Sequence, residues 1–260
     1  MIKKRLILFM VCLMFVLSIV GVNSQQFVEA KDKIIIGMAR AFSGPLAQTG
    51  DNAFTPIAEM WLDEVNEEGG IYVEEYGKKL PVEFLKYDTK SDTGTMTRMM
   101  EKLILEDEVD FIFPPISTAH LYAAAPIANK HGYILSGMEG GARHLKEYME
   151  ELPYFFSNLN FCDHQIPVLV DILAEKGVET VAMVYISDLH GVEYSEISTK
   201  LLEERGIEIV MTKSISPGAK DLSSVIKDAK AQNVDAFLSF TYPNESILVT
   251  KQSIELGFNP

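Results

Sequence analysis

Short apolar runs alternate with longer amphipathic stretches along most of the chain. The first run, at 33–39, is rich in isoleucine and has the pattern of a strand buried on both faces. Such runs are followed by segments with apolar residues at i, i+3, i+4 and i+7, which is typical of amphipathic helices. The pattern predicts strands at 33–39, 82–87, 110–113, 133–136, 181–185, 207–211 and 235–240, and helices at about 51–66, 92–103, 119–130, 165–176, 191–205, 221–232 and 245–255.

Two of these helices carry especially clear signals. In the helix predicted at 51–66, five apolar side chains share one face: Ala53, Ile57, Met60, Trp61 and Val65. Asp92 is placed to cap the next helix, whose apolar residues have core spacing: Met96, Met99, Met100 and Leu103. A methionine stripe of this kind favours packing in a core over a metal or cofactor site.

Alternating strands and helices predict right-handed βαβ units, and therefore an α/β fold with parallel sheets flanked by helices. The alternation breaks near 153–158, which predicts a hinge there between two lobes, at 31–152 and 159–260. In open α/β sheets, ligands bind beyond the carboxyl ends of the strands. The candidate binding loops are therefore those at 43–50, 114–119, 136–141 and 187–191.

The four candidate loops mix glycine with hydroxyl and charged side chains just before a helix begins. Free backbone N–H groups at helix starts favour an anion such as a carboxylate. The same residue types also serve as plain helix caps and turn formers, and this alternative stays open for any single loop. Four such loops at successive strand ends favour a binding role.

The first thirty residues have the order of regions typical of a secretory signal peptide. Lys3, Lys4 and Arg5 precede an apolar run that ends near residue 22, and small residues suited to cleavage follow. We predict a signal peptide at 1–30, with cleavage after Ala30 or near Ser24, and export of the remaining chain. An uncleaved anchor is the alternative, because about 17 apolar residues lie at the short limit for crossing a bilayer.

Composition narrows the functional class. The 260 residues carry a net charge of −14, which disfavours nucleic acid, since phosphate binding needs clustered cations. Two cysteines cannot form a four-cysteine zinc site, and the five histidines show no ligand spacing, so no metal or cofactor is predicted. The chain has no nucleophile elbow, Walker loop or zinc-protease motif. The sequence therefore predicts a binding protein rather than an enzyme.

Several segments match those of a known family in both order and spacing. They are the string from Gly37 to Gly50 and the segments at 65–71, 124–128, 188–191 and 218–223. In them the chain resembles the extracytoplasmic solute-binding proteins of branched-chain amino acid ABC importers, the leucine/isoleucine/valine-binding protein family. The resemblance covers essentially all of the chain after the predicted signal. It implies a type I periplasmic-binding fold, in which two lobes close on an amino acid, and an ABC permease as partner.

The resemblance also implies which residues meet the ligand. Thr49 falls where the family has an aromatic wall of the pocket, and Ser117 or Thr118 falls where a hydroxyl meets the ligand carboxylate. His190 replaces a family tyrosine, and Tyr242 matches a tyrosine that faces the ligand from the second lobe. The stretch that gives the family backbone amides and a threonine hydroxyl corresponds here to Glu139, Gly140 and Gly141.

Three of these positions depart from the family pattern: Thr49, Gly141 and His190. The resemblance therefore implies an amino acid or amide-like polar solute rather than a particular branched-chain amino acid. A carboxylate at Glu139 would repel a ligand carboxylate unless it turns away or pairs with a ligand amine. The predicted function is a monomeric substrate-binding component of an importer. An extracellular sensing module of a receptor with the same fold is the alternative.

The family continues beyond the position of Pro260. Its next strand bears the acid that holds the ligand ammonium, and the chain then returns to the first lobe. The resemblance therefore implies a C-terminally incomplete member.

Overall fold

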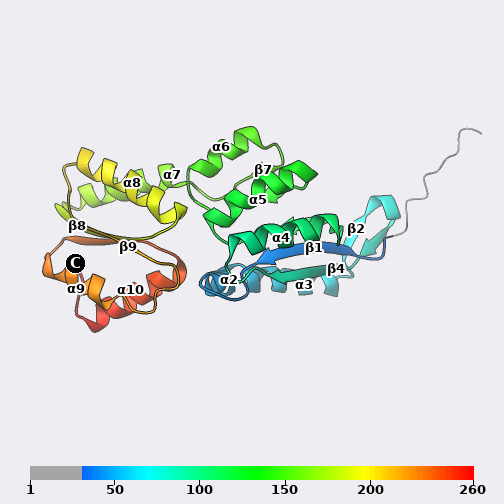
Figure 1. Ribbon diagram of the computed structural model, residues 1–260, viewed down its shortest axis with the longest axis horizontal. Helices are drawn as coiled ribbons and strands as arrows, with labels where there is room; N and C mark the ends of the chain where they lie inside the picture. Colours follow the sequence, from blue (N-terminus) through cyan, green and yellow to red (C-terminus); the bar gives the residue numbers. More distant parts are fainter. Residues whose placement is uncertain (1–30) are drawn as a thin grey trace, which may run out of the picture.

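The computed structural model describes residues 31–260, so the signal peptide predicted at 1–30 and its alternative, the uncleaved anchor, lie outside the described residues. Two groups of strands and helices lie side by side in the ribbon (Figure 1). We call the elements from β1 to β7 the first lobe and those from α7 to α10 the second lobe. The predicted α/β fold with parallel sheets flanked by helices is confirmed.

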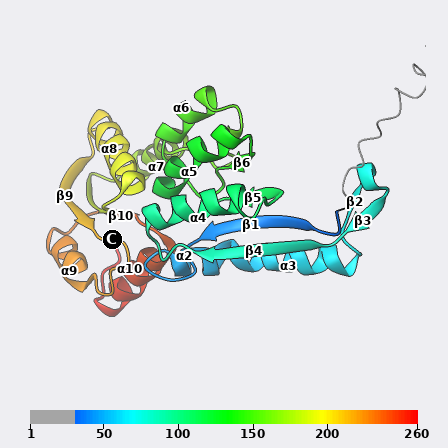
Figure 2. The ribbon, with the colours of Figure 1, turned by 45° about the vertical axis from the view of Figure 1, so that its right-hand side comes forward.

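The main sheet of the first lobe is parallel and has the strand order β4-β1-β5. Its central strand, β1 (Ile34–Arg40), pairs along its whole length with β4 (Val82–Asp88). On its other side β1 pairs with the shorter β5 (Phe111–Phe113). All three strands end toward the second lobe, as Figure 2 shows for β1 and β4. This arrangement brings the loops that follow the strands close to the junction of the lobes.

Two smaller sheets complete the strands of the first lobe. β6 (Leu135–Ser136) and β7 (Phe155–Phe156) form a parallel pair. β2 (Ile71–Val73) and β3 (Lys78–Leu80) form an antiparallel hairpin around a short 3-10 turn at Glu74–Tyr76. The sequence pattern does not predict this hairpin, because its strands are short and mostly exposed.

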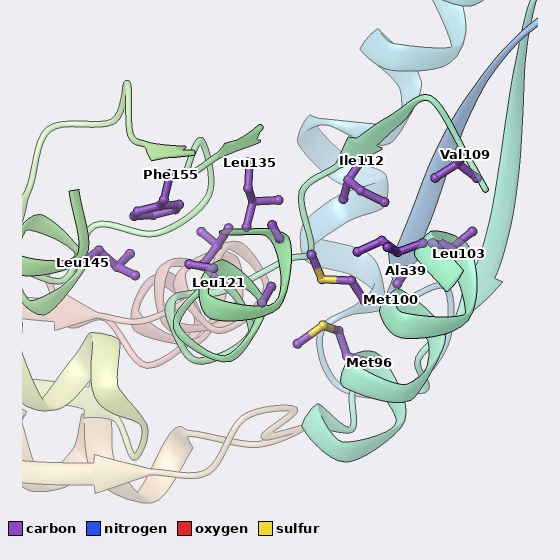
Figure 3. Packing of buried hydrophobic residues seen from close by; sticks show 14 of the residues in the cluster. Ala39, Met96, Met100, Leu103, Val109, Ile112, Leu121, Leu135, Leu145 and Phe155 are labelled. Carbon is purple, nitrogen blue, oxygen red and sulfur yellow. The ribbon is translucent and has the colours of Figure 1, made fainter. Parts of the chain in front are cut away.

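One face of the first sheet packs against α4 (Thr93–Leu105). α5 (Thr118–His131) packs on α4 and on the β6-β7 pair, and α6 (His144–Glu151) packs on α5. Asp92 caps α4 as predicted, since its carboxylate accepts a hydrogen bond from the Thr95 amide at 2.7 Å. The methionine stripe of α4 lies in the core, also as predicted. Figure 3 shows this core, which includes Ala39, Met96, Met100, Leu103, Ile112, Leu121 and Leu135.

The single helix predicted at 51–66 is wrong. The chain forms two helices there, α2 (Ala47–Ala53) and α3 (Thr55–Glu67), with a break at Phe54. Pro56 lies in the first turn of α3. Proline has no backbone N–H to continue a preceding helix, but its fixed φ suits the first turn of a new one.

The apolar face predicted for this segment is packed only in part: Val65 packs against the cluster of Ile34, Leu80 and Val82. The side chains of Ile57 and Met60 on α3 are 62% and 56% exposed. Ile57 and Trp61, together with Phe84 and Phe113 of the sheet, line a wholly apolar hollow of about 430 Å³. The apolar spacing predicted for α3 is therefore correct, but Ile57 and Trp61 line this open hollow.

The second lobe is built on a parallel sheet with the order β10-β8-β9. β8 (Thr180–Ile186) is central and pairs with β9 (Glu208–Ile215) and β10 (Ala236–Phe240). β8 has a mostly apolar sequence because helices cover it on both faces.

Helices cover both faces of this second sheet (Figure 1). α7 (Cys162–Glu175) and α8 (Leu189–Glu204) lie on one face and pack against each other. α9 (Ser223–Ala231) and α10 (Pro243–Glu255) lie on the other. Both α8 and α10 begin where a strand ends, so their first turns lie at the junction with the first lobe.

The two lobes are in direct contact. One apolar cluster joins Leu46 and Ile116 of the first lobe to Val184 and Tyr242 of the second. α2 packs against α10, and α5 packs against α8. The segment predicted as the hinge, 153–158, contains β7, and its role as a hinge stays a prediction.

Candidate functional site

Two buried hydroxyl groups lie at the start of α5. Ser117 is the N-cap residue, and its Oγ accepts a hydrogen bond from the His120 amide at 3.3 Å. The φ angle of Ser117 is 84°, a conformation that costs a residue other than glycine about 1–3 kcal/mol. Ser117 and Thr118 are both almost completely buried. The loop therefore holds its two hydroxyls in a strained, fixed position near the second lobe.

Glycines allow the loop after β6 to approach α5 and α8 closely. A Cβ atom added at Gly140 would lie 2.7 Å from a methyl of Leu121 and 3.3 Å from the Cα of Thr118. A Cβ atom at Gly141 would lie 2.4 Å from the hydroxyl of Tyr194 on α8. The structure therefore brings Thr118, Gly140 and Gly141 together, and it places Tyr194 of the second lobe against them.

Aromatic side chains of the second lobe stack beside this loop. The Tyr242 hydroxyl donates a hydrogen bond to the Asp188 carboxylate at 2.6 Å. The His190 ring lies 5.3 Å from that of Tyr242, at an angle of 18°, and 4.3 Å from that of Tyr194. Asp188 also caps α8 by accepting a hydrogen bond from the Gly191 amide at 3.2 Å. One capping residue thus orients both Tyr242 and the turn that carries His190.

Burial favours the uncharged forms of Tyr242 and His190. Burial raises the pKa of Tyr242 well above its ordinary value, and the neighbouring Asp188 carboxylate raises it further. Ser117 acts on this pKa in the opposite direction through a hydrogen bond to the tyrosine. Burial lowers the pKa of His190, against the opposing effect of Asp188. Tyr242 also packs in one apolar cluster with Ile116 of the first lobe, so it lies at the junction of the lobes.

A buried ion pair lies at the end of β1. The Arg40 Nη1 atom is 2.7 Å from the Glu139 Oε1 atom, and the two side chains are 0% and 2% exposed. Arg40 also donates to the Pro114 carbonyl and lies 5.0 Å above the Phe113 ring. Burial raises the pKa of Glu139, and Arg40 opposes that effect. Of the arrangements considered for Glu139, the structure shows a carboxylate that turns to a cation of the chain itself.

Thr49 lies on α2. Its side chain is buried, and its Oγ1 has no hydrogen-bond partner among the described residues. A Cβ atom at the adjacent Gly50 would lie 3.4 Å from the Arg40 Nη2 atom. Among the predicted residues, Glu139 is paired with Arg40, and Thr49 precedes the glycine that approaches the same guanidinium. Thr118, which follows Ser117, lies close to Gly140, and Gly141 approaches Tyr194. His190 lies between Tyr194 and Tyr242. Their contact with a ligand stays a prediction.

Glu193 on α8 is a second buried carboxylate, and it ties the two lobes together. It accepts a hydrogen bond from the Arg143 amide at 2.6 Å and contacts the His144 Nδ1 atom at the start of α6. Sequence reasoning missed this residue, because a glutamate within a helix normally reads as exposed. The sequence does contain a signal for Arg40, because a single arginine ends an otherwise apolar buried strand. Such a position indicates a buried charge that needs a partner.

A hollow of about 350 Å³ adjoins the aromatic stack. His190 and Tyr194 line one side of it, and Ser239 and Thr241 at the end of β10 line another. Its mixed apolar and hydroxyl lining suits a small polar organic molecule.

The described part of the chain, residues 31–260, contains no group of three or more histidine, cysteine, aspartate or glutamate side chains that could hold a metal ion. It also contains no helix with the length and apolar character needed to cross a membrane.

A family model described as periplasmic binding protein matches residues 33–260. The chain belongs to this family. The resemblance stated from the loop sequences is therefore confirmed. A curated relative, Leu/Ile/Val-binding protein homolog 7 of Brucella melitensis, is 27% identical over 243 residues. That match covers 89% of this chain and 58% of the relative, so the chain spans less than two thirds of the relative's length.

Solved structures share the fold of this family member. The branched-chain amino acid transporter substrate-binding protein LivJ of Streptococcus pneumoniae, in complex with isoleucine, matches with a TM-score of 0.73 and 22% identity, over 87% of this chain and 62% of that protein. A solute-binding protein of an ABC transporter from R. palustris, in complex with 4-hydroxybenzoate, matches with a TM-score of 0.71 and 20% identity, over 87% and 59%. Matches at this identity show a common fold.

Proposed function

We propose that this chain is the substrate-binding component of an ABC importer, and that it captures an amino acid or related small polar solute between its two lobes. One observation carries the proposal. Loops of both lobes meet at this place: Tyr242 of the second lobe packs with Ile116, the residue before Ser117, and Tyr194 of the second lobe lies against Gly141 of the first. Family membership and the name of the curated relative support a solute-binding role.

The chemistry of the proposed site suits a ligand with an anionic group. In this proposal the hydroxyls of Ser117 and Thr118 and the amides of Gly140 and Gly141 donate hydrogen bonds to that group from the first lobe. The Thr118 Oγ1 atom is buried and has no hydrogen-bond partner among the described residues, so it is available to a ligand. Neutral Tyr242 and its stacked neighbours supply the opposing wall. The chain acts in this proposal by binding and not by catalysis.

The proposal extends to the organisation of the whole chain. Residues 1–30 act as a signal peptide, and the protein works as a monomer in the periplasm or at the outer face of the cytoplasmic membrane. The lobes at 31–152 and 159–260 move about the hinge at 153–158. Closure on the solute then creates the surface that an ABC permease recognises.

A thermal-shift screen tests the proposed function. The panel contains the twenty L-amino acids, their amides and small carboxylates, each at millimolar concentration. A compound that binds the folded state and not the unfolded state raises the melting temperature by mass action. We expect a rise for at least one amino acid or amide. No rise with any member of the panel would contradict the proposed function.

Removing the two hydroxyls at the start of α5 should weaken binding of the amino acid or amide that responds in this screen. The double variant Ser117→Ala, Thr118→Ala loses hydrogen bonds to a charged acceptor, which costs about 1–3 kcal/mol, or about 5- to 150-fold in affinity. Titration calorimetry measures the change. The matched control is Thr212→Ala, Ser214→Ala, which removes two exposed hydroxyls from β9 and should leave affinity unchanged. Equal affinity in the first variant and the wild type would place the anion elsewhere.

A further inference from the structure

The side chain of Glu193 makes its polar contacts across the junction of the lobes. It lies near the start of α8 and is 2% exposed. Its Oε2 atom accepts a hydrogen bond from the Arg143 amide at 2.6 Å, and its Oε1 atom contacts the His144 Nδ1 atom. Arg143 and His144 begin α6, in the first lobe. The carboxylate is therefore a direct polar link between α8 and α6.

The contacts of Glu193 lie next to other contacts between the lobes. Tyr194, the next residue on α8, lies against Gly141. The Gly141 carbonyl accepts a hydrogen bond from the amide of Cys162, the first residue of α7, at 2.7 Å. The Cys162 thiol in turn donates a weak hydrogen bond to Glu193 Oε2 at 3.8 Å. A movement that separates α8 from α6 breaks the contacts of Glu193 with the first lobe and exposes its carboxylate.

A buried carboxylate is costly unless a cation accompanies it. Among the described residues, the basic side chain within ion-pair distance of Glu193 is that of His144. The His144 side chain is 41% exposed, so it can exchange a proton with water while Glu193 stays buried. Protonated His144 offsets the charge of Glu193. Neutral His144 can still donate a hydrogen bond from Nδ1, but it leaves the negative charge without a counter-charge.

Other ionisable groups surround this pair on α6, α7 and α8. Burial raises the pKa of the Cys162 thiol and raises the pKa of Tyr194 to about 12. Asp163 of α7 pairs with Lys146 of α6 at 3.1 Å, so these two charges offset each other. β8 and β10, which lie under α8, carry no charged residue. Exposed charged or titratable side chains on the same helices are those of Arg143, Glu147, His164 and Glu196.

His144 differs from the two buried histidines near this junction. Burial lowers the pKa of His120 on α5 and of His190 on α8, so burial favours their neutral forms. The charge of a histidine ordinarily changes between pH 5 and pH 8. Because His144 combines partial exposure with contact to a buried carboxylate, it is the group that makes the link between α6 and α8 respond to pH.

We infer that Glu193 and His144 form a pH-sensitive lock that holds the two lobes in contact. Contact with the carboxylate favours the charged histidine, so the stabilisation of the closed arrangement is present in mild acid and is lost as the pH rises and the histidine loses its proton. The lobes therefore separate more readily at pH 8.0 than at pH 5.5. This inference rests on the lobe movement of the proposed function and goes beyond it by naming the contact that opposes opening.

Two measurements on the chain without any ligand test the lock. Small-angle X-ray scattering at pH 5.5 and pH 8.0 gives the radius of gyration, which increases when the lobes separate. Amide hydrogen exchange gives the protection factor of the Arg143 amide, corrected for the intrinsic effect of pH on exchange. In the wild-type chain we expect a larger radius at pH 8.0 than at pH 5.5. We also expect a protection factor at least about fivefold lower at pH 8.0.

Two variants remove the lock, and each has a matched control. Glu193→Gln keeps the length of the side chain and an acceptor for the Arg143 amide but removes the charge, and His144→Gln removes the titrating ring. Both should show the same radius at the two pH values. The controls are Glu196→Gln, at an exposed position on α8, and His164→Gln, at an exposed position in the first turn of α7. Both controls should keep the wild-type change with pH.

The outcomes of this experiment are separate from those of the ligand screen. A wild-type radius that is unchanged or smaller at pH 8.0 overturns the inference. A change with pH in Glu193→Gln that equals the wild-type change also overturns it. In both cases the proposed function stands, because the thermal-shift screen tests it independently. Circular dichroism checks that each variant folds, and if Glu193→Gln does not fold, the comparison of His144→Gln with His164→Gln decides.

Discussion

Replacing Arg40 by methionine should lower the free energy of unfolding by about 3–5 kcal/mol, because the change leaves Glu139 as an unpaired buried carboxylate. Both side chains are inaccessible to solvent, so water cannot take over the role of the guanidinium. Urea-induced unfolding at pH 7 measures the effect as a fall in the denaturation midpoint at an unchanged slope.

Two control variants separate the loss of the pair from other effects at this position. The double variant Arg40→Met, Glu139→Leu should recover most of the lost stability, since apolar side chains of similar volume often replace a buried ion pair at little cost. Lys86→Met breaks an ion pair with Glu59 that is largely exposed, and should change stability by less than about 1 kcal/mol. If the double variant were as unstable as Arg40→Met, the ion pair would not be the cause.

Replacing Gly191 by alanine should destabilise the second lobe by about 1–3 kcal/mol, at the upper end of that range, because the new methyl group has no room. Its Cβ would lie 2.0 Å from the carbonyl oxygen and 2.7 Å from the amide nitrogen of Ile186. These are backbone atoms of β8 and cannot rotate away. The first turn of α8 must therefore shift and carry His190 with it, so ligand affinity should fall too. Calorimetric unfolding and titration measure the two effects.

Gly94→Ala is the matched control for this prediction. Gly94 also lies in the first turn of a helix, α4, but the nearest atoms to an added Cβ there are 3.6 Å away. Helix propensity alone favours alanine over glycine by up to about 1 kcal/mol at both positions. A Gly191→Ala variant as stable as Gly94→Ala would show that the loop at 188–191 is not tightly packed.

The fold could be predicted from the sequence because its strong signals are local. Each helix that packs on a sheet shows apolar residues at helical spacing, and the buried strands read as apolar runs. The break between α2 and α3 also had a local signal in Pro56. The apolar residues at helical spacing across 51–66 concealed this signal, because they predict one continuous helix. The hairpin of β2 and β3 had no such signal, because exposed short strands need no apolar alternation.

The site was less predictable, because its main contacts join residues that are distant along the chain. Family resemblance identified Thr49 and Glu139 as site positions, but no local pattern pairs Glu139 with Arg40. The pairing exists only after β1 and the loop after β6 meet in space. Glu193 likewise finds its partner, the Arg143 amide, on the other lobe, so the helical pattern around it gives no indication of its role.

The central claim is that one solute is held by residues of both lobes. Amide NMR spectra of the ¹⁵N-labelled chain, titrated with the pool of twenty L-amino acids and then with its responding member, test this claim most directly. Thr118 and Gly140 of the first lobe and His190 and Gly191 of the second should shift together and saturate at one dissociation constant. Shifts confined to one lobe, or to the apolar hollow beside Ile57 on α3, would contradict the claim, and so would the absence of any shift.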